Sequence, residues 1–396
     1  MKTKGRLPRN VWVAGLVSLF NDASSEMIYP LLPLFITGVL KASKSSLGVI
    51  EGVAEATASV AKVFSGVWSD RFRTRRLPMF LGYGFSLAAR PFVAVAGSWE
   101  MVLGARFLDR VGKGVRTAPR DAVLEDSTPV EMRGRAYGVH RAMDTAGAAV
   151  GPAVAMILLS VFAWQIRSVF WISILPGLVA LLCIAFIRDE IPERPSGART
   201  PSLRLALGIG GPFRQFLWVT ALFTLANSSD TFLLLKARAA GFSVSGVTGV
   251  YLLFNLFYAA ISGPIGAFSD LWGRRRVTAL SFFYYGAVYL GFAVATSPWA
   301  VAVLFVLYGP FQAVEEGVKK AYLSELIPKE LMGSGMGVYN AVRGLALLPA
   351  SILTGVLWDR LGPAWAFGVD AAIAAAAGLL FMGMILAGRR RPAPAG

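Results

Sequence analysis

The sequence is poor in cysteine, in histidine and in charge. Among its 396 residues, Cys183 is the one cysteine and His140 is the one histidine, which excludes a disulfide framework and thiolate or imidazole metal sites. Charged residues make up 16% of the chain, against about 25% in soluble domains, and this shortage excludes a soluble globular protein. The sequence also lacks a Gly-x-x-x-x-Gly-Lys-Ser/Thr phosphate loop, so ATP hydrolysis through that motif is excluded. We expect no cofactor and no metal.

Apolar residues, at 55% of the chain, gather in long runs. A membrane-spanning helix needs about 20 apolar residues, and spanning segments are helical because unpaired backbone groups in lipid are costly. The sequence therefore predicts an all-α membrane protein with twelve transmembrane helices. The expected spans are residues 11–38, 47–69, 78–97, 101–123, 135–159 and 167–187, followed by residues 215–238, 245–268, 277–296, 299–323, 334–357 and 364–387.

The formal net charge is +16. In a soluble chain such a charge would indicate a nucleic-acid partner, but here it is better explained by topology, since inside loops of membrane proteins are rich in Lys and Arg. Most of the basic residues lie in the segments that are inside when the N-terminus is inside. We therefore expect a multi-pass protein of the cytoplasmic (inner) membrane with both termini inside, with the lipid bilayer as a partner and no nucleic acid. No small-residue cleavage site follows the first apolar run, which predicts a retained helix.

The pattern Gly-x-x-x-Asp followed by a basic cluster occurs twice, about half the chain apart. Its residues are Gly66, Asp70 and Arg71 in the first copy, and Gly266, Asp270, Gly273 and Arg274 in the second. Two further pairs match at nearly the same offset: Ser24-Ser25-Glu26 with Ser228-Ser229-Asp230, and Gly138-Val139-His140 with Gly337-Val338-Tyr339. The repeat predicts two pseudo-symmetric six-helix bundles, residues 1–187 and 215–396, joined by a cytoplasmic linker at 188–214. Such repeats are typical of secondary transporters, and one chain holding both bundles suffices as a monomer.

The two basic turns resemble the inside-loop signature of the major facilitator superfamily, Gly-x-x-x-Asp-Arg/Lys-x-Gly-Arg-Arg/Lys. The second copy departs from it at Leu271, and the first has Arg73 in place of the second glycine. The resemblance implies the major facilitator fold and alternating access to a central site. It also implies that Asp70 and the nearby arginines close the inside gate by pairing with a helix of the opposite half. The alternative is that the basic turns only set the topology.

The expected fifth helix carries Gly138, Gly147 and Gly151-Pro152. This spacing resembles the antiporter motif of the drug–proton branch of the superfamily, with Ala155 in place of the motif's last glycine. The resemblance implies proton-coupled efflux. The alternative is that the glycines only let two helices pack closely.

Several ionisable residues fall at membrane depth, where each costs about 2.5–3.5 kcal/mol to insert. Asp22 and Glu26 are four residues apart and share a helix face, and they are candidates for proton coupling, with Asp230 as the counterpart in the second half. The alternative is that the two carboxylates form a structural pair with an arginine.

The expected fourth helix has a charged stripe, with spacings of three and four residues. The stripe comprises Arg106, Asp109, Arg110, Lys113, Arg116 and Arg120. Such a stripe predicts a water-filled cavity, and the family resemblance implies that Arg106 or Arg110, depending on the register, takes part in a proton relay. The alternative for Arg116 and Arg120 is that they extend to the inside surface.

Further polar side chains in the expected spans complete the predicted substrate cavity. They are Asn21, Lys113, His140, Arg141, Asp144, Asn227, Gln312, Glu315, Glu316, Lys319, Asn340 and Arg343. Opposite charges among them are expected to pair across the interface between the halves. The predicted function is secondary active transport with protons and a small-molecule substrate as partners, most simply proton-coupled efflux of amphiphilic or drug-like compounds. The alternative is a proton-coupled carrier of an anionic organic solute, because arginine forks bind carboxylate or phosphate well. Without a Ser-His-Asp group or a metal cluster in the sequence, we expect a transporter and not a membrane-embedded enzyme.

Overall fold

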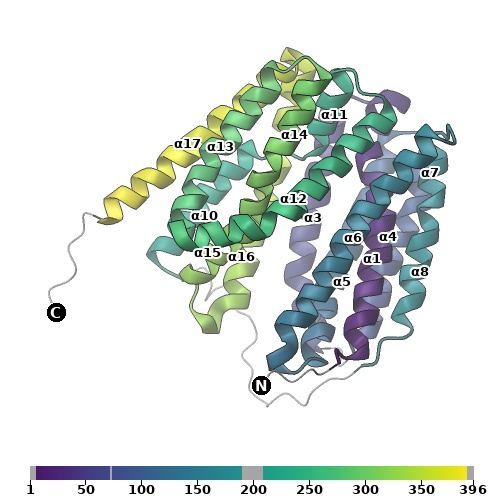
Figure 1. Ribbon diagram of the computed structural model, residues 1–396, viewed down its shortest axis with the longest axis vertical. Coiled ribbons are helices and arrows are strands. Elements are labelled where there is room, and N and C mark those ends of the chain that lie inside the picture. The colour runs from purple at the N-terminus through teal and green to yellow at the C-terminus, as the bar shows by residue number, and fades with distance from the viewer. Residues whose placement is uncertain (1–5, 72–73, 190–207, 390–396) are drawn as a thin grey trace. The chain divides into compact units, whose positions relative to one another are not determined.

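The computed structural model describes residues 6–71, 74–189 and 208–389, with the side chains of residues 63–71, 330, 388 and 389 outside the description. Within these ranges all regular elements are helical (Figure 1), which confirms the predicted all-α class. The long helices are α1 (Arg9–Ile28), α3 (Lys44–Arg71), α4 (Arg76–Val95), α5 (Trp99–Asp126), α6 (Arg133–Ser160), α8 (Ile174–Ile184), α10 (Gly211–Ala226), α12 (Val244–Trp272), α13 (Arg274–Val294), α14 (Pro298–Ala313), α16 (Met332–Leu361) and α17 (Pro363–Arg389). The short elements are η1 (Tyr29–Leu31), α2 (Leu32–Leu34), η2 (Phe35–Val39), η3 (Val130–Met132), α7 (Ile166–Ile172), α11 (Thr231–Ala239), η4 (Val314–Val318), α15 (Lys319–Leu326) and η5 (Lys329–Leu331).

Seven helical stretches of the described residues are long and apolar enough to cross a membrane. They are Val130–Ser160, Ile166–Ile184, Val244–Trp272, Arg274–Val294, Pro298–Leu326, Met332–Leu361 and Pro363–Ala387. The other expected spans coincide with α1, α3, α4 and α5 and with the interrupted pair α10 and α11. The first four carry ionisable residues within their length, among them Asp22 of α1, Glu51 of α3, Arg90 of α4 and Arg106 of α5. These helices are less apolar because some of their side chains face a polar interior.

The contacts between Cα atoms divide the chain into two units. Unit 1 comprises Met1–Ala42, Val53–Thr200 and Phe242–Leu252, and unit 2 comprises Ser43–Gly52, Pro201–Gly241 and Leu253–Gly396. The units differ from the two expected bundles in two short segments, because the first residues of α3 belong to unit 2 and those of α12 to unit 1. The expected linker at 188–214 falls largely on residues 190–207, which lie outside the described residues.

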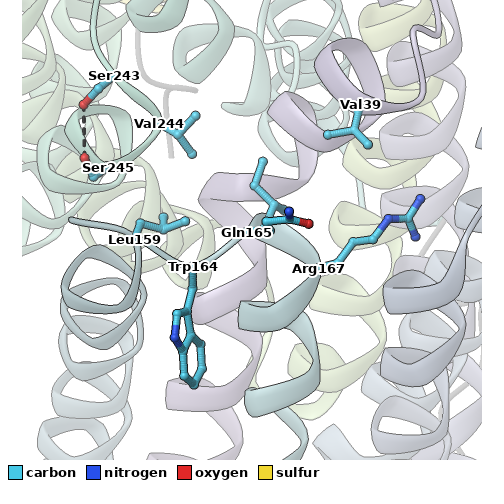
Figure 2. A pocket seen from close by; sticks show the side chains of 9 residues that line it. Val39, Leu159, Trp164, Gln165, Arg167, Ser243, Val244 and Ser245 are labelled. Atoms are coloured by element: carbon cyan, nitrogen blue, oxygen red, sulfur yellow. Dashed lines mark hydrogen bonds between the residues drawn. The ribbon is translucent and has the colours of Figure 1, made fainter. Parts of the chain in front are cut away.

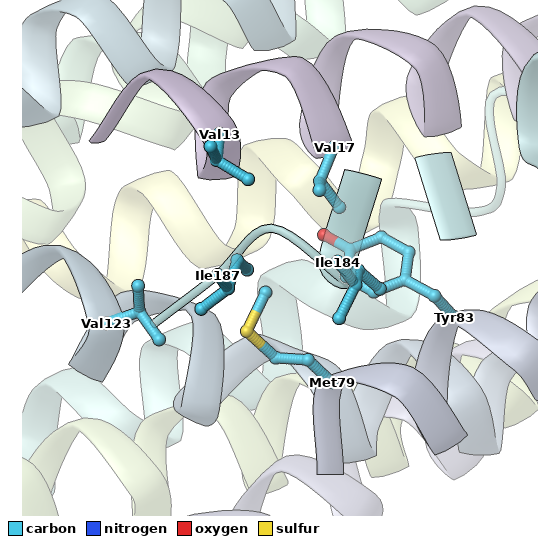
Figure 3. Packing of buried hydrophobic residues seen from close by; sticks show 7 residues of the cluster. All are labelled: Val13, Val17, Met79, Tyr83, Val123, Ile184 and Ile187. Atoms are coloured by element: carbon cyan, nitrogen blue, oxygen red, sulfur yellow. The ribbon is translucent and has the colours of Figure 1, made fainter. Parts of the chain in front are cut away.

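Unit 1 is held together by apolar packing between helices that run side by side (Figure 1). Its best-defined cluster joins α1, α4, α5 and the end of α8 (Figure 3). The cluster comprises Val13, Val17, Met79, Tyr83, Val123, Ile184 and Ile187. In unit 2, α17 packs along α10, α13 and α16. These contacts fix the helices that carry the polar side chains described below.

The first and tenth expected spans are helical throughout but irregular. The span predicted at 11–38 changes after Ile28 into the 3₁₀ turn η1, the short helix α2 and the π turn η2. Pro30 and Pro33 explain this change, because proline has no N–H with which to continue the α-helical bonding. The span predicted at 299–323 contains the π turn η4, and such turns are frequent at functional sites.

The seventh expected span, residues 215–238, is wrong as a continuous helix. Helix α10 ends at Ala226 and α11 begins at Thr231, so Asn227–Asp230 are not helical. The segment reads Asn-Ser-Ser-Asp, whose short polar side chains compete for backbone hydrogen bonds. Ser229 shows this competition: its Oγ accepts hydrogen bonds from both the N–H (3.4 Å) and the hydroxyl (3.0 Å) of Thr231.

Polar and apolar side chains are distributed as lipid requires. Leu182 and Leu379 are 67% and 66% exposed, and in water a surface of this kind would cause aggregation. Glu315, Lys319 and Asp370 are instead buried. The distribution is favourable when the surrounding solvent is hydrocarbon, because charge at membrane depth is then tolerated only inside the protein.

The glycines of α6 differ in how closely they meet α1, which gives a test of this packing. A Cβ on Gly151 would lie 2.5 Å from the carbonyl oxygen of Ala23 and 2.9 Å from the Cβ of Glu26, whereas a Cβ on Gly138 would meet nothing within 4 Å. We expect Gly151→Ala to destabilise the protein by about 1–3 kcal/mol and Gly138→Ala to have no such effect. Unfolding in mixed micelles measures both, and equal stability of the two variants would contradict the packing.

Candidate functional site

Asn21 on α1 is the centre of a buried polar network in unit 1. Its side-chain oxygen accepts hydrogen bonds from Arg116 of α5 (2.8 Å) and Arg90 of α4 (3.3 Å), and its amide donates to Asp22 (3.0 Å). Arg116 also lies over the ring of Tyr83, 4.3 Å from the ring centroid. The alternative in which Arg116 extends to the surface is therefore wrong. Arg120 instead binds its neighbour Asp121, with an N–O distance of 3.0 Å.

Asp22 of α1 and Asp144 of α6 face each other and are close enough for their carboxyl groups to hydrogen-bond. A hydrogen bond between two carboxyl groups needs a proton on one of them, because two carboxylates at this separation repel. Arg141 pairs with Asp144 from the same helix, at 3.1 Å. The structure thus brings the predicted residues Asp22, Arg141 and Asp144 together.

Glu26 lies one turn further along α1 and accepts a hydrogen bond from the hydroxyl of Tyr251 (2.8 Å). Tyr251 belongs to the part of α12 that is in unit 1, and its ring packs against that of Tyr29, with centroids 5.5 Å apart. Arg106, Arg110 and Lys113 of α5 all act electrostatically on Glu26. Its negative charge is therefore balanced by several cations and not by a single salt bridge.

The charged stripe of α5 faces the interior of unit 1. Arg106 pairs with Asp109 (3.5 Å), and Arg110 pairs with Glu55 of α3 (3.1 Å). Both arginines are buried, so the structure does not select one register of the family motif over the other. His140 is buried as well, and its Nε2 and the hydroxyl of Ser18 are 2.8 Å apart, which joins α6 to α1.

In unit 2, the predicted residues of the tenth helix form buried ion pairs. Glu315 binds Lys319 within the π turn η4 and the start of α15, and the Nζ of Lys319 lies 4.4 Å from the ring centroid of Phe223. Arg343 of α16 approaches both Glu315 and Glu316, at 3.6 Å each. Gln312 lies close to Glu315 in the sequence and Asn340 lies close to Arg343, and both side chains are half-buried. These pairs lie inside unit 2, and the predicted pairing between the halves stays a prediction.

The interrupted seventh helix places Asn227 and Asp230 in the interior of unit 2. Asn227 is buried, and Asp230 accepts a hydrogen bond from the hydroxyl of Tyr308 (2.8 Å). Asp230 belongs to unit 2, whereas the repeat-related Glu26 belongs to unit 1. The repeat predicted two equivalent carboxylates, but their hydrogen-bond partners are different tyrosines in different elements.

The second basic turn is an ion-pair network at the end of α12. Arg274 binds Asp270 (2.8 Å) and Glu325 of α15 (2.9 Å). Gly273 has a φ of 90°, which a glycine adopts without the strain of a side chain, and Gly266 has no neighbour within 4 Å of an added Cβ. The side chains of Gly66, Asp70 and Arg71 lie outside the described residues, so the first turn stays a prediction.

The motif glycines of α6 have two different environments. Gly147 and Gly151 are buried against the backbone of α1, and Pro152 is a buried proline inside the helix. The expectation of close approach is correct for these two glycines. It is wrong for Gly138, which is exposed beside open space.

Several ionisable residues inside the units were not predicted from the sequence. They are the buried Glu51, Arg75, Arg90, Lys236 and Asp370 and the half-buried Glu55. Each is a charged residue inside or beside an apolar run, and this property alone marks a functional candidate in a membrane protein. Apart from Arg75 of the first basic cluster, they lie outside the charged stripe of α5 and outside the repeat-related positions, which were the sequence signals that marked the other candidates.

One pocket of about 480 Å³ opens on unit 1 (Figure 2). It is lined by Val39, Leu159, Trp164, Gln165, Ile166, Arg167, Ser243, Val244 and Ser245. None of the predicted cavity residues is among them. Arg167 donates to the carbonyl oxygens of Ala94 (2.7 Å) and Ala96 (2.8 Å), so it holds the end of α4.

Comparison with known proteins gives consistent matches. Residues 14–251 and 217–396 match the family model described as the Major Facilitator Superfamily. An uncharacterized MFS-type transporter of Methanocaldococcus jannaschii is 34% identical over 385 residues, covering 95% of each chain. The cis,cis-muconate transport protein of Acinetobacter baylyi is 24% identical over 88% of this chain and 89% of its own, and macrolide efflux protein A of Streptococcus pyogenes is 22% identical over 89% of each. The crystal structure of the nucleoside transporter NupG superposes with a TM-score of 0.78 at 12% identity, covering 96% of this chain and 99% of that one.

The buried pair in the tenth helix predicts unequal effects of two neighbouring substitutions. Glu315→Ala leaves Lys319 buried without its carboxylate, and we expect a loss of about 3–5 kcal/mol of stability. Glu316→Ala removes the partner of Lys320, whose side chain is 46% exposed, and we expect a loss of about 0–1 kcal/mol. Unfolding by denaturing detergent in mixed micelles measures both losses of stability. Equal losses would contradict the expectation that the buried pair stabilises the protein more than the exposed pair does.

Proposed function

The chain belongs to the Major Facilitator Superfamily and is a multi-pass membrane transporter of small molecules, and from this premise we propose that it exports amphiphilic or drug-like compounds in exchange for protons. The protein alternates between states that expose a central site to either side of the membrane. It acts as a monomer in the cytoplasmic (inner) membrane, with both termini inside, as the distribution of basic residues favours.

The observation that carries this proposal is the carboxyl pair of Asp22 and Asp144. One proton between them satisfies the pair, and its release leaves two carboxylates that repel across the contact between α1 and α6. Asn21 links Asp22 to Arg116 of α5 and Arg90 of α4. A change in the charge of the carboxyl pair therefore alters the electrostatic force on these two arginines. Protonation therefore changes the forces between the helices of unit 1.

Glu26 provides the second site of the proposed mechanism. Its hydrogen bond with Tyr251 is retained whether the carboxyl group is charged or neutral, since the tyrosine hydroxyl donates it. The charged form of Glu26 attracts a cationic or amphiphilic substrate, so binding of such a substrate near Glu26 competes with proton binding. This competition is the simplest physical basis for exchange in opposite directions.

Efflux is supported by the position of the glycine motif. Gly147 and Gly151 bring α6 against α1 beside Asp22 and Glu26, so the motif shapes the site at which the proton is proposed to bind. The similarity to macrolide efflux protein A, although only 22% identical, agrees with this direction of transport.

The second candidate function is proton-coupled transport of an anionic organic solute. The specific observation in its favour is the excess of cations in unit 1, where Arg90, Arg106, Arg110 and Arg116 are all buried. Guanidinium groups bind carboxylates with two parallel hydrogen bonds. The similarity to the protein of Acinetobacter baylyi that is named a cis,cis-muconate transport protein supports this alternative.

Transport in proteoliposomes under an imposed pH gradient tests the proposal. Ethidium and cis,cis-muconate serve as the two probes, and the internal pH is recorded in the same vesicles. We expect ethidium and protons to move in opposite directions, and Asp22→Asn to reduce this coupled flux by about 5–150-fold, the range of a typical coupling energy, without a change in stability.

Glu131→Gln is the matched control, because Glu131 is exposed in the turn η3, and it should transport as the unmodified protein does. Full coupled transport by Asp22→Asn would remove Asp22 from the mechanism. Movement of muconate together with protons, with no movement of ethidium, would establish the second candidate function in place of the first.

A further inference from the structure

The break in the seventh helix places the C-terminal end of α10 inside unit 2. Helix α10 ends at Ala226, and the last carbonyl groups of a helix carry partial negative charge. The N–H of Asn227 donates to the carbonyl oxygens of Phe223 and Thr224 (3.1 Å each), and the hydroxyl of Tyr285 donates to that of Ala226 (2.7 Å). The negative end of α10 therefore points into the segment Asn227–Asp230.

Asp370 of α17 lies beside this segment with none of its surface exposed. Its carboxylate accepts hydrogen bonds from the hydroxyls of Ser228 and Thr354, both at 3.2 Å. Among the described residues, no lysine, arginine or histidine acts on it. All of its neighbours are therefore neutral hydroxyl donors, and a buried carboxylate without a positive partner is strongly unfavourable.

Tyr289 of α13 supplies an independent observation at the same place. Its hydroxyl is fully buried and has no hydrogen bond of good geometry with any described residue. Its ring stacks on Tyr285, with centroids 4.0 Å apart and 25° between the planes. The hydroxyl lies next to Ser228 and within electrostatic reach of Asp230 and Asp370. The hydroxyls of Tyr285 and Ser228 are within hydrogen-bonding reach of it but poorly aligned, so a bound ion would give this buried hydroxyl a better-placed partner.

A second carboxylate lies on the other side of the broken segment. Glu51, in the part of α3 that belongs to unit 2, is buried and accepts a hydrogen bond from the hydroxyl of Ser229 (3.3 Å). The N–H of Ser229 points to the hydroxyl of Ser351 (3.4 Å). The unwound segment is thus surrounded by carboxylate, hydroxyl and carbonyl oxygens from several helices.

We propose that the oxygen atoms around the broken seventh helix, chiefly those of Asp370, Ser228, Thr354 and Tyr289, bind a sodium ion. Hard oxygen ligands of this kind suit alkali and alkaline-earth cations, and unwound helices with free carbonyls are used in this way in transporters. One charge on the ion balances the single carboxylate among these four side chains, whereas a divalent ion would leave an excess of positive charge on them. This proposal departs from the expectation of no metal, which was based on the scarcity of cysteine and histidine in the sequence.

The site is separate from the proposed proton position. Its residues lie in unit 2, whereas Asp22 and Asp144 lie in unit 1. It is tested by equilibrium binding, so its failure and the failure of proton-coupled export are distinguishable.

The test measures binding of ²²Na⁺ to the purified full-length protein in detergent, with choline chloride keeping the ionic strength constant. Thermal unfolding, followed through the ten tryptophans, is measured in parallel in NaCl, KCl and choline chloride. We expect saturable binding of ²²Na⁺ and a midpoint that rises with NaCl more than with the other two salts, since an ion that binds the folded state stabilises it. Asp370→Asn should abolish both effects.

Tyr289→Phe removes one hydroxyl and keeps the ring, so it tests the site even if Asp370→Asn does not fold. We expect it to weaken sodium binding by about 10–100-fold, the range found when an interaction that supports a metal site is lost. Tyr339→Phe is the matched control, because Tyr339 is an equally buried tyrosine of α16 outside the cluster, and it should bind sodium normally. Absence of saturable binding, equal stabilisation by all three salts, or equal affinity of the two tyrosine variants would overturn the proposal.

Discussion

Compensation of buried charge inside the helix bundle is the constraint on which the rest of this structure depends. Lipid offers no partner to a charge, so every ionisable group at membrane depth needs a partner within the protein. Arg116 and Asn21, Arg110 and Glu55, and Lys319 and Glu315 meet this need. Because the partners come from neighbouring helices or successive turns, the same contacts that make the charges tolerable also set which helices move together.

The two units differ in the side chains that surround their buried charges. Unit 1 has an excess of guanidinium groups around Asp22 and Glu26, whereas the interior of unit 2 near the broken helix is rich in hydroxyl and carboxylate oxygens around Asp370. An internal repeat therefore does not mean equivalent sites. The two halves share their helix order and their basic turns, and they differ in the side chains that face inward, which is where the function of a transporter resides.

Apolar periodicity was sufficient to predict the helices, since α6 runs from Arg133 to Ser160 against an expected span of 135–159. Spacing also correctly placed Asp22, Glu26 and the α5 stripe on inward faces. The break at Asn227–Asp230 was not predicted, because the apolar runs on both sides continue without a proline or glycine. The partners of Asp22 and Asp370 were not predictable either, since they depend on how α6 packs against α1 and how α17 packs against the broken segment Asn227–Asp230, which are distant in sequence.

If each unit encloses a charged, hydrated interior within a surface covered by lipid, a residue of the interior is accessible to water and a residue of the outer surface is not. Chemical modification of single cysteines measures this accessibility directly. Single cysteines at Asn340 and Leu379, in a Cys183→Ser background, are exposed to a charged thiol reagent in proteoliposomes. The account predicts modification of Asn340→Cys and protection of Leu379→Cys, although Leu379 is far more exposed on the isolated protein. Modification of Leu379→Cys with protection of Asn340→Cys would contradict it.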